Sequence, residues 1–264
     1  MSVEPIAQDM NALRQRVERF VRTELMVLPA FKDLLSLTGS YGPAALFGGL
    51  IRDLALGYAR DFSSDVDIVV KDVPSGVLAR FAGRHAAERN SFGGFRLPLG
   101  RWLFDVWTFE TTWAFSAGLV KGNALADLLS TTFFNWDAVL LDLEKRQLMA
   151  RPSYLTDLQR GCLAINLRET PNELGAAVRA LRLMWQAEAT VTPDLAEFIN
   201  AQILEHGLDK IVATDAKRSG RRRLTRDYVG SLAVSLRQHL LDRPGEPFRF
   251  ASLQRALPLD MAAG

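Results

Sequence analysis

Apolar side chains near the N-terminus recur with the period of a helix. They lie three to five residues apart, with arginine and glutamate between them, at Leu13, Val17, Phe20 and Leu25. A helix with this pattern buries one face against a core. We therefore predict an amphipathic helix that ends at Pro29, because proline interrupts helical hydrogen bonding.

A strand, a glycine turn and a short helix are predicted next. Turn-forming residues gather at 39–43 (GSYGP), and the apolar run AALF follows at 44–47. Gly48 and Gly49 end this run, after which residues 50–56 return to helical spacing. Glycine pairs favour sharp turns, so the expected order is turn, strand, glycine turn and helix.

Further strands are predicted downstream. Residues 65–70 (DVDIVV) alternate and then become continuously apolar, which is typical of a strand with a covered face. Residues 101–110 (RWLFDVWTFE) are rich in aromatic and β-branched side chains, which favour strands. Other elements expected in this part are a helix over 74–90, a hairpin punctuated by glycines at 93, 94 and 100, and a hairpin over 139–148.

Beyond about residue 155 the pattern becomes helical. Helical spacing is found at 176–187 (AAVRALRLMWQA), 193–206, 208–218 and 226–241. We therefore predict an α+β fold. Residues 1–150 are expected to form a small mixed β-sheet domain with flanking helices, including the N-terminal one, and residues 151–264 a helical body.

Composition narrows the class of protein. The 264 residues are 48% hydrophobic and 23% charged with a net charge of +2, which excludes a disordered chain and gives no global sign of a nucleic-acid partner. The single cysteine, Cys162, excludes an internal disulfide and a cysteine-based zinc site. The longest apolar run, at 44–51, is far shorter than the ~20 residues that span a bilayer, and the N-terminus lacks a signal-peptide pattern. We expect a cytoplasmic protein with no membrane partner.

Two aspartates give the clearest chemical signal. Asp65 and Asp67 are two residues apart on a predicted strand, so their side chains leave the same face. Carboxylates this close repel each other, and Mg²⁺, which favours a few carboxylates plus substrate phosphates, relieves that repulsion. A third carboxylate would allow a second metal ion, and Asp105 on the later strand is the best candidate. Glu110, on the opposite face of that strand, is a weaker one.

The glycine turn supplies the other half of a candidate site. Gly48 and Gly49 would let backbone N–H groups approach phosphate oxygens at the start of a helix. Arg52, in the first turn of that helix, can bind a phosphate or a ribose, and Asp53 is expected to orient Arg52 or the ribose. A glycine pair alone is usually a tight turn, and Asp-x-Asp alone is usually a solvated strand end. Their order within about 20 residues is the informative signal.

The combined motif resembles a known family. GGLIRDLALG at 48–57, followed by DVDIVV at 65–70, is similar to the head of the class II tRNA nucleotidyltransferases and bacterial poly(A) polymerases, within the DNA polymerase β-like nucleotidyltransferase superfamily. The resemblance covers about residues 44–110, with a fainter trail to about 187. It implies a mixed sheet, two Mg²⁺ ions, and transfer of a nucleoside monophosphate from ATP or another nucleoside triphosphate (NTP) with release of pyrophosphate.

The resemblance also implies roles for individual residues. Asp65, Asp67 and Asp105 would be the catalytic metal ligands, with Asp105 in the segment FDVWTF. Arg179 and Arg182 match the family's helix whose arginines face the incoming base.

Three departures from the family pattern bear on the acceptor. Residues 130–135 (STTFFN) lack the arginines that hold triphosphate in the family, and Ala176 stands where an acidic residue precedes the arginine helix. About 75 residues follow that helix, fewer than the body and tail of a full CCA-adding enzyme. We therefore do not expect complete CCA synthesis.

A basic cluster near the C-terminal end has two interpretations. Six cations fall in the ten residues 217–226, and those expected to contact RNA are Lys217, Arg218, Arg221, Arg222 and Arg223. They can track an RNA backbone, or they can form a solvated surface or a subunit contact. The tryptophans are expected in the core, although Trp107 shares the strand face of Asp105.

Three functions remain open at this point. The leading hypothesis is a Mg²⁺-dependent nucleotidyltransferase acting on the 3′ hydroxyl of an RNA, with tRNA as the expected acceptor. The second keeps the chemistry but transfers the nucleotide to a small-molecule or protein hydroxyl. The third is a non-catalytic module that binds nucleotide.

Overall fold

The computed structural model describes residues 4–58, 65–90, 92–219 and 224–250. Contacts divide the chain into two compact units. The first, here called the head unit, comprises Met1–Arg160 and Ile165–Pro171, and the second, the helical unit, comprises Gly161–Ala164 and Asn172–Gly264.

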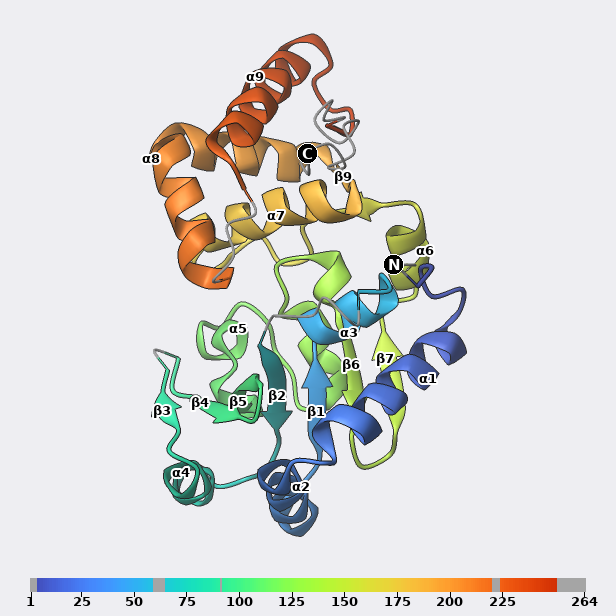
Figure 1. Cartoon of the computed structure of the whole chain (residues 1–264), viewed down its shortest axis with the longest axis vertical. Coiled ribbons are helices and arrows are strands. Elements are labelled where there is room, and N and C mark those ends of the chain that lie inside the picture. The colour runs from blue at the N-terminus through green and yellow to red at the C-terminus, as the bar shows by residue number, and fades with distance from the viewer. Residues whose placement is uncertain (1–3, 59–64, 91, 220–223, 251–264) are drawn as a thin grey trace, which may run out of the picture. The chain divides into compact units, whose positions relative to one another are not determined.

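Seven strands of the described residues form one mixed sheet in the head unit, in the order β3-β4-β5-β2-β1-β6-β7 (Figure 1). They are β1 (Ala44–Phe47), β2 (Val66–Val70), β3 (Glu88–Arg89), β4 (Phe95–Leu99), β5 (Trp102–Thr108), β6 (Val139–Asp142) and β7 (Gln147–Ala150). β2 and β5 pair in parallel, and the other pairs are antiparallel. β1 is buried along its whole length, and β2 is buried except at Asp67, as expected for strands covered on both faces. The strands and hairpins predicted from the sequence are confirmed.

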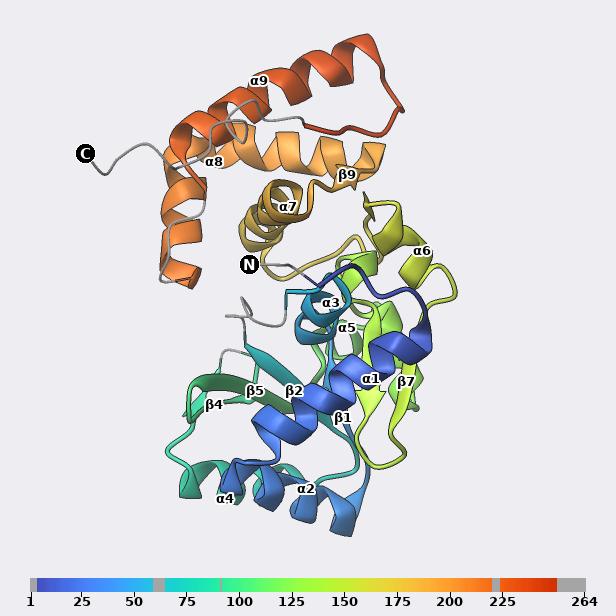
Figure 2. The ribbon, with the colours of Figure 1, turned by 45° about the vertical axis from the view of Figure 1, so that its right-hand side comes forward.

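Helices flank this sheet. The α-helices are α1 (Met10–Phe20), α2 (Pro29–Tyr41), α3 (Gly49–Ala55), α4 (Ser75–Arg84), α5 (Trp113–Ser116) and α6 (Tyr154–Gln159), with a π-helical turn at Val21–Leu25 and 3₁₀ turns at Phe109–Thr111, Leu125–Ser130 and Asn135–Asp137. α1 lies along one face of the sheet and contacts α3 and β7 (Figure 2). Its predicted apolar face is buried at Leu13, Val17, Phe20 and, in the π-helical turn, Leu25.

The first helical stretch was predicted to end at Pro29; in the structure it ends at Leu25, and Pro29 belongs to the next helix. Pro29 begins α2, where it occupies the first position and its missing N–H removes no helical bond. Residues 39–41, predicted as part of a turn, belong to α2, which ends at Tyr41 and has Gly42 as its C-cap.

The helix predicted over 74–90 is too long. α4 ends at Arg84, and Glu88–Arg89 instead form a short edge strand, β3. Between them Ala86 has a left-handed backbone with φ 50°, and the Ala87 N–H donates back to the carbonyl of Ala82 at 3.1 Å. Such helix ends usually carry glycine, so the alanine left no stop signal in the sequence.

The described part of the helical unit contains three helical segments and a two-stranded parallel sheet (Figure 1). These are α7 (Glu173–Ala187), α8 (Pro193–Ser219), α9 (Arg226–Asp242), β8 (Cys162–Leu163) and β9 (Thr190–Val191). α8 packs against both α7 and α9. Gly207 (φ 72°, ψ 163°) breaks α8, which agrees with the separate helices predicted over 193–206 and 208–218.

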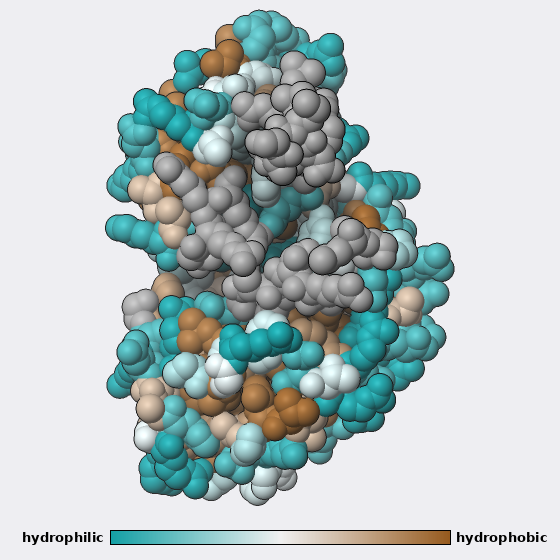
Figure 3. All heavy atoms as spheres, viewed as in Figure 1, coloured by the Kyte–Doolittle hydropathy of each residue, from teal (hydrophilic) through white to brown (hydrophobic). Residues whose placement is uncertain are grey.

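The visible surface is mostly hydrophilic, with apolar residues scattered over it (Figure 3). Large apolar side chains that are exposed among the described residues lie in both units, at Val27, Tyr41, Phe92, Leu119, Leu204, Val234 and Leu241. None of the described helices has the length and apolar character to cross a membrane.

Candidate active site

The register of the sheet aligns two of the predicted carboxylates. β2 and β5 are parallel neighbours, and Asp67 is the direct partner of Asp105. Neighbouring strands lie ~4.8 Å apart, and directly paired residues project to the same face of a sheet. Asp65 precedes Asp67 by two residues, so the same strand spacing directs its side chain to that face.

A fourth charged residue joins these carboxylates. Arg96 on β4 is the antiparallel partner of Asp105. Its Nε donates to Asp105 Oδ1 at 3.1 Å, and its Nη2 donates to Asp105 Oδ2 at 2.7 Å. The same Nη2 also donates to Asp65 Oδ2 at 3.1 Å. The structure therefore brings Asp65 and Asp105 together around one guanidinium, with Asp67 in register beside them.

The sequence analysis did not single out Arg96, although a signal was present. Gly100 (φ 63°) and Arg101 form the turn between β4 and β5. A two-residue hairpin turn fixes the pairing of the strands that it joins. Counting outward from this turn pairs Arg96 with Asp105, as observed.

The charges of this group act on one another. The pKa of Arg96 is raised above its ordinary value, first by the hydrogen bond to Asp105; burial, the second-largest effect, lowers it, and the charges of Asp105, Asp65 and Asp67 raise it further. Arg96 therefore stays protonated. The side chain of Asp105 is 16% exposed, and those of Asp65 and Arg96 are 37% and 44% exposed. The group is open to solvent on the Arg96 side and more enclosed around Asp105.

The three carboxylates are suitable ligands for a hard divalent cation, but their oxygens are not arranged around a common metal position. Carboxylate oxygens are the ligands that Mg²⁺ prefers. Among the described residues, no group of three or more histidine, cysteine, aspartate or glutamate side chains has the geometry to hold a metal ion. The position between Asp65 and Asp105 is taken by a different cation, the Arg96 guanidinium.

The glycine turn lies at the end of the strand next to Asp67. Phe47, the last residue of β1, pairs with Asp67, and Gly48 follows it directly. Gly48 has φ 70° and ψ −120°, a conformation that side chains disfavour. Its N–H donates to the Val139 carbonyl at 2.9 Å, and its carbonyl accepts from the Arg52 N–H at 3.1 Å. The chain thus places a glycine corner beside the carboxylates.

Arg52 points into the protein, which differs from the expected contact with phosphate or ribose. Its Nε donates to Asp53 Oδ1 at 2.9 Å, which agrees with the expectation that Asp53 orients it. Its Nη1 donates to Asp137 in the 3₁₀ turn Asn135–Asp137. Burial lowers the pKa of Arg52, but the charges of Asp53 and Asp137 outweigh this effect and raise it above its ordinary value. Arg52 is a buried cation that fastens α3 to the 3₁₀ turn.

Tyr154 completes this buried cluster. Its hydroxyl is buried and has no hydrogen-bond partner. Burial, reinforced by the charge of Asp137, raises the pKa of Tyr154 well above its ordinary value.

Comparison with known proteins addresses the fold. The sequence matches no family model, and no curated protein is similar enough to match. Solved structures do match. A Thermotoga maritima CCA-adding enzyme complexed with tRNA aligns over 91% of this chain and 57% of its own, with TM-score 0.55 and 21% identity. A CCA-adding enzyme with ATP aligns over 81% of this chain and 53% of its own, with TM-score 0.52 and 19% identity.

This chain has the CCA-adding enzyme fold. A tRNA nucleotidyltransferase complexed with a primer tRNA and an incoming ATP analog is a further match, over 81% of this chain and 61% of its own, with TM-score 0.50 and 19% identity. At this level of identity the likeness establishes the fold, and the chain spans little more than half the length of these proteins. The α+β architecture and the resemblance drawn from the motifs are confirmed as a fold.

Arg179 and Arg182, both predicted to face the incoming base, have different surroundings in the structure. Arg179 lies on the exposed side of α7. Arg182 forms an ion pair with the fully buried Asp215 of α8, and its Nη2 donates to the Asp215 carbonyl at 2.7 Å. Asp215 also accepts from the Leu224 N–H at 3.0 Å. Arg182 therefore ties α7 to α8, which differs from the expected role of facing a base.

The basic cluster is only partly described. Lys217 is exposed at the end of α8. Arg221, Arg222 and Arg223 lie outside the described residues, as does the side chain of Arg218. Their contact with RNA stays a prediction.

Trp107 packs near the carboxylates. Its Nε1 donates to Thr112 Oγ1 at 3.0 Å, and its ring meets that of Phe47 edge-on with 6.4 Å between centroids. Trp107 thereby supports the end of β1 that leads into the glycine corner.

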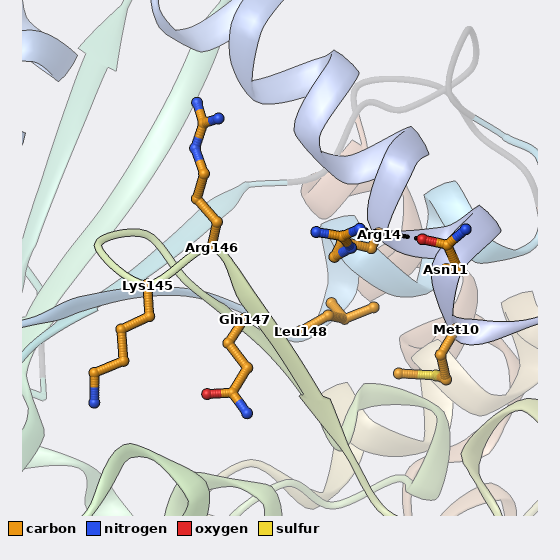
Figure 4. A pocket seen from close by; sticks show the side chains of 7 residues that line it. All are labelled: Met10, Asn11, Arg14, Lys145, Arg146, Gln147 and Leu148. Atoms are coloured by element: carbon orange, nitrogen blue, oxygen red, sulfur yellow. Dashed lines mark hydrogen bonds between the residues drawn. The ribbon is translucent and has the colours of Figure 1, made fainter.

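A groove of about 500 Å³ lies elsewhere in the head unit. It is lined by Met10, Asn11, Arg14, Lys145, Arg146, Gln147 and Leu148, from α1 and the β6–β7 hairpin. Arg14 donates to Asn11 Oδ1 at 3.1 Å, whereas Lys145 and Arg146 extend in different directions (Figure 4). These cations do not converge on one point, and none of the predicted site residues lines the groove.

Proposed function

We propose that the protein is a Mg²⁺-dependent nucleotidyltransferase that transfers a nucleoside monophosphate from an NTP to the 3′ hydroxyl of an RNA, with tRNA as the acceptor. The observation that carries this proposal is the register of Asp67 with Asp105, with Asp65 held to Asp105 through Arg96, beside the Gly48 corner. The proteins that share the fold include a CCA-adding enzyme with ATP and one complexed with tRNA, which supports both substrates.

The reaction requires charge neutralisation and alignment. A bond forms between the acceptor oxygen and the α-phosphorus, the bond from that phosphorus to the bridging oxygen breaks, and pyrophosphate leaves. Two Mg²⁺ ions, when bound, would offset the negative charge of the phosphates and favour ionisation of the acceptor hydroxyl. Asp65, Asp67 and Asp105 would hold them, since their carboxylates share one face of the sheet.

The rest of the head unit positions these groups. Gly48 is buried and its N–H is bound to the Val139 carbonyl, so the half-buried Gly49, the first residue of α3, is the residue of this corner that phosphate oxygens would approach. Arg52 holds that corner from the buried side through Asp53 and Asp137. The corner is therefore preorganised before substrate binds, which lowers the cost of aligning the triphosphate.

One observation favours a different acceptor. Residues 130–135 carry no cation where the family has triphosphate-binding arginines. The structure packs this segment inward: Thr132 and Phe134 are buried, and Asn166 Nδ2 donates to the Thr132 carbonyl at 3.1 Å. Because this segment departs from the pattern of family members that extend RNA, the site is compatible with transfer to a small-molecule or protein hydroxyl.

The test is incorporation of radiolabelled nucleotide. Each of the four NTPs is supplied with Mg²⁺ and a tRNA transcript lacking its 3′ terminus, and small-molecule and protein fractions serve as alternative acceptors. We expect label on the tRNA, reduced about 100-fold or more in Asp67→Asn, since removing a metal ligand costs several kcal/mol of transition-state stabilisation. Asp33→Asn, an exposed carboxylate of α2, is the matched control and should keep full activity.

The outcomes separate the functions. Label on a small molecule or protein, and none on RNA, would select the alternative acceptor. Mg²⁺-dependent NTP binding with no transfer to any acceptor would leave the non-catalytic module. Equal transfer by the wild type and Asp67→Asn would reject the proposed site.

A further inference from the structure

The guanidinium of Arg96 lies between two of the carboxylates that the proposed function assigns to metal binding. Its Nη2 contacts Asp65 and Asp105 at the same time, at 3.1 and 2.7 Å. This placement is set by backbone pairing, because Arg96 is the direct partner of Asp105 in the β4–β5 hairpin.

Arg96 uses both oxygens of Asp105. Oδ1 accepts from Nε at 3.1 Å, and Oδ2 accepts from Nη2 at 2.7 Å. Such a two-point contact between a guanidinium and a carboxylate is among the stronger ion pairs in proteins. A metal ion needs the same oxygens at a shorter distance, about 2.1 Å for Mg²⁺. A metal ion that bridges Asp65 Oδ2 and Asp105 Oδ2 must therefore displace the Arg96 Nη2 that now contacts both oxygens.

The arginine is the partner that is able to leave. Its side chain is 44% exposed, whereas that of Asp105 is 16% exposed. A long side chain beside water can adopt another rotamer at small cost, because water solvates the released guanidinium. Asp105 sits mid-strand between β2 and β4 and is fixed by both neighbours.

In the protein without a bound metal ion, the positive charge of Arg96 offsets the negative charges of the three carboxylates. Three negatively charged carboxylates on one face of the sheet repel one another. One guanidinium offsets part of that repulsion and holds Asp65 and Asp105 near each other.

We propose that Arg96 is a positioning residue that acts as an internal counter-cation. It holds Asp65 and Asp105 when no divalent cation is bound, and it releases them when one binds. The inference rests on the proposed function, because it assigns the metal site to the same carboxylates. Its consequence is that divalent cations bind the free protein by exchange with Arg96, so removing the guanidinium tightens their binding.

The experiment measures binding of Mn²⁺ to the nucleotide-free protein. Free Mn²⁺ is followed by electron paramagnetic resonance, and the midpoint of thermal unfolding is recorded with and without the ion. The variants are Arg96→Gln, which removes the charge, and Arg96→Lys, which keeps the charge but not the two-point contact. Arg80→Gln, an exposed arginine of α4, is the matched control with the same change in net charge.

We expect Arg96→Gln to bind Mn²⁺ about 10-fold more tightly than the wild type, equal to about 1.4 kcal/mol. Arg96→Lys should fall between them, and Arg80→Gln should match the wild type. Mn²⁺ should also raise the unfolding midpoint more in Arg96→Gln than in the wild type. Unfolding transitions that remain cooperative show that each variant is folded.

Two results would overturn the proposal, and they are distinguishable. If Arg96→Gln binds Mn²⁺ as tightly as the wild type or more weakly, and Asp105→Asn abolishes binding, the metal site stands but Arg96 is not its counter-cation. If Asp105→Asn does not weaken Mn²⁺ binding, or no variant binds Mn²⁺, the metal site itself fails, and with it the metal-dependent part of the proposed function.

Discussion

Arg52 and Arg96, among the described residues of the head unit, each lie between two aspartates, and the two clusters differ in burial. Arg52 with Asp53 and Asp137 is almost entirely enclosed, whereas Arg96 with Asp65 and Asp105 faces solvent on one side. A buried ion pair cannot lose one partner without leaving a charge away from water. An exposed pair can, because water takes the place of the lost partner. Ion pairs between arginine and aspartate are therefore permanent in the buried Arg52 cluster and exchangeable in the exposed Arg96 cluster.

The largest effect is expected from removing the buried cation. Arg52→Met should lower the free energy of unfolding by about 3–5 kcal/mol, since Asp53 and Asp137 would be left buried beside each other. Arg96→Met, the matched change in the exposed cluster, should alter it by no more than about 1 kcal/mol. Urea unfolding followed by circular dichroism measures both values. Similar losses in the two variants would show that burial does not distinguish the clusters.

A smaller effect is expected at the glycine corner between the two clusters. Gly48→Ala should lower the free energy of unfolding by about 1–3 kcal/mol, because its backbone (φ 70°, ψ −120°) disfavours a side chain. The nearest atom to an added Cβ is the Asp137 carbonyl oxygen at 3.7 Å, so the cost comes from backbone strain and not from a clash.

The matched control for this substitution is Gly39→Ala in α2. An added Cβ at Gly39 meets nothing within 4 Å, and alanine is favoured over glycine in a helix. Urea unfolding should show Gly39→Ala to be neutral or stabilising. Equal destabilisation by both substitutions would remove the argument that Gly48 is conformationally required.

The hydrophobic pattern of the sequence predicted that the carboxylates converge, but it did not single out the arginine that pairs with them. Asp65 and Asp67 follow the two-residue period of a strand, and Asp105 lies at the centre of another apolar strand. Local pattern is enough for such predictions, as it is for the helix break at Gly207. Arg96 required the exact hairpin register, which follows from the turn length and not from periodicity.

The arginines that point inward show a second limit. The sequence placed Arg52 and Arg182 on helices, and they lie on α3 and α7. Their partners Asp137 and Asp215 lie 85 and 33 residues away along the chain. Which way a long side chain turns is decided by such distant partners, and these become visible only once the elements have packed.

The smallest effect is expected from Tyr154, at the border of the buried cluster. The unfolded chain loses the tyrosine proton near pH 10, whereas the folded protein keeps it to higher pH because the pKa of Tyr154 is raised by burial. The stability that depends on this proton is complete below about pH 10 and declines as the pH rises above it, by at most about 1.4 kcal/mol per pH unit.

Tyr154→Phe removes this dependence. Below about pH 10 the variant should be as stable as the wild type or slightly more stable, because the buried hydroxyl has no hydrogen-bond partner to lose. Urea unfolding at about pH 9 and about pH 11 measures the difference between the two proteins. Parallel stability changes of both proteins over this range would show that Tyr154 ionises as readily in the folded state as in the unfolded one.

The measurement that tests the account most directly is pyrophosphate release from each NTP by the wild type and by Asp105→Asn, with Mg²⁺ and an acceptor RNA. The account predicts that the wild type releases one pyrophosphate for each nucleotide transferred. Asp105→Asn should lose about 100-fold or more of this rate while unfolding at an unchanged urea concentration. Equal rates in the two proteins, or no release with any NTP and acceptor, would contradict the claim that Asp65, Asp67 and Asp105 form a catalytic centre.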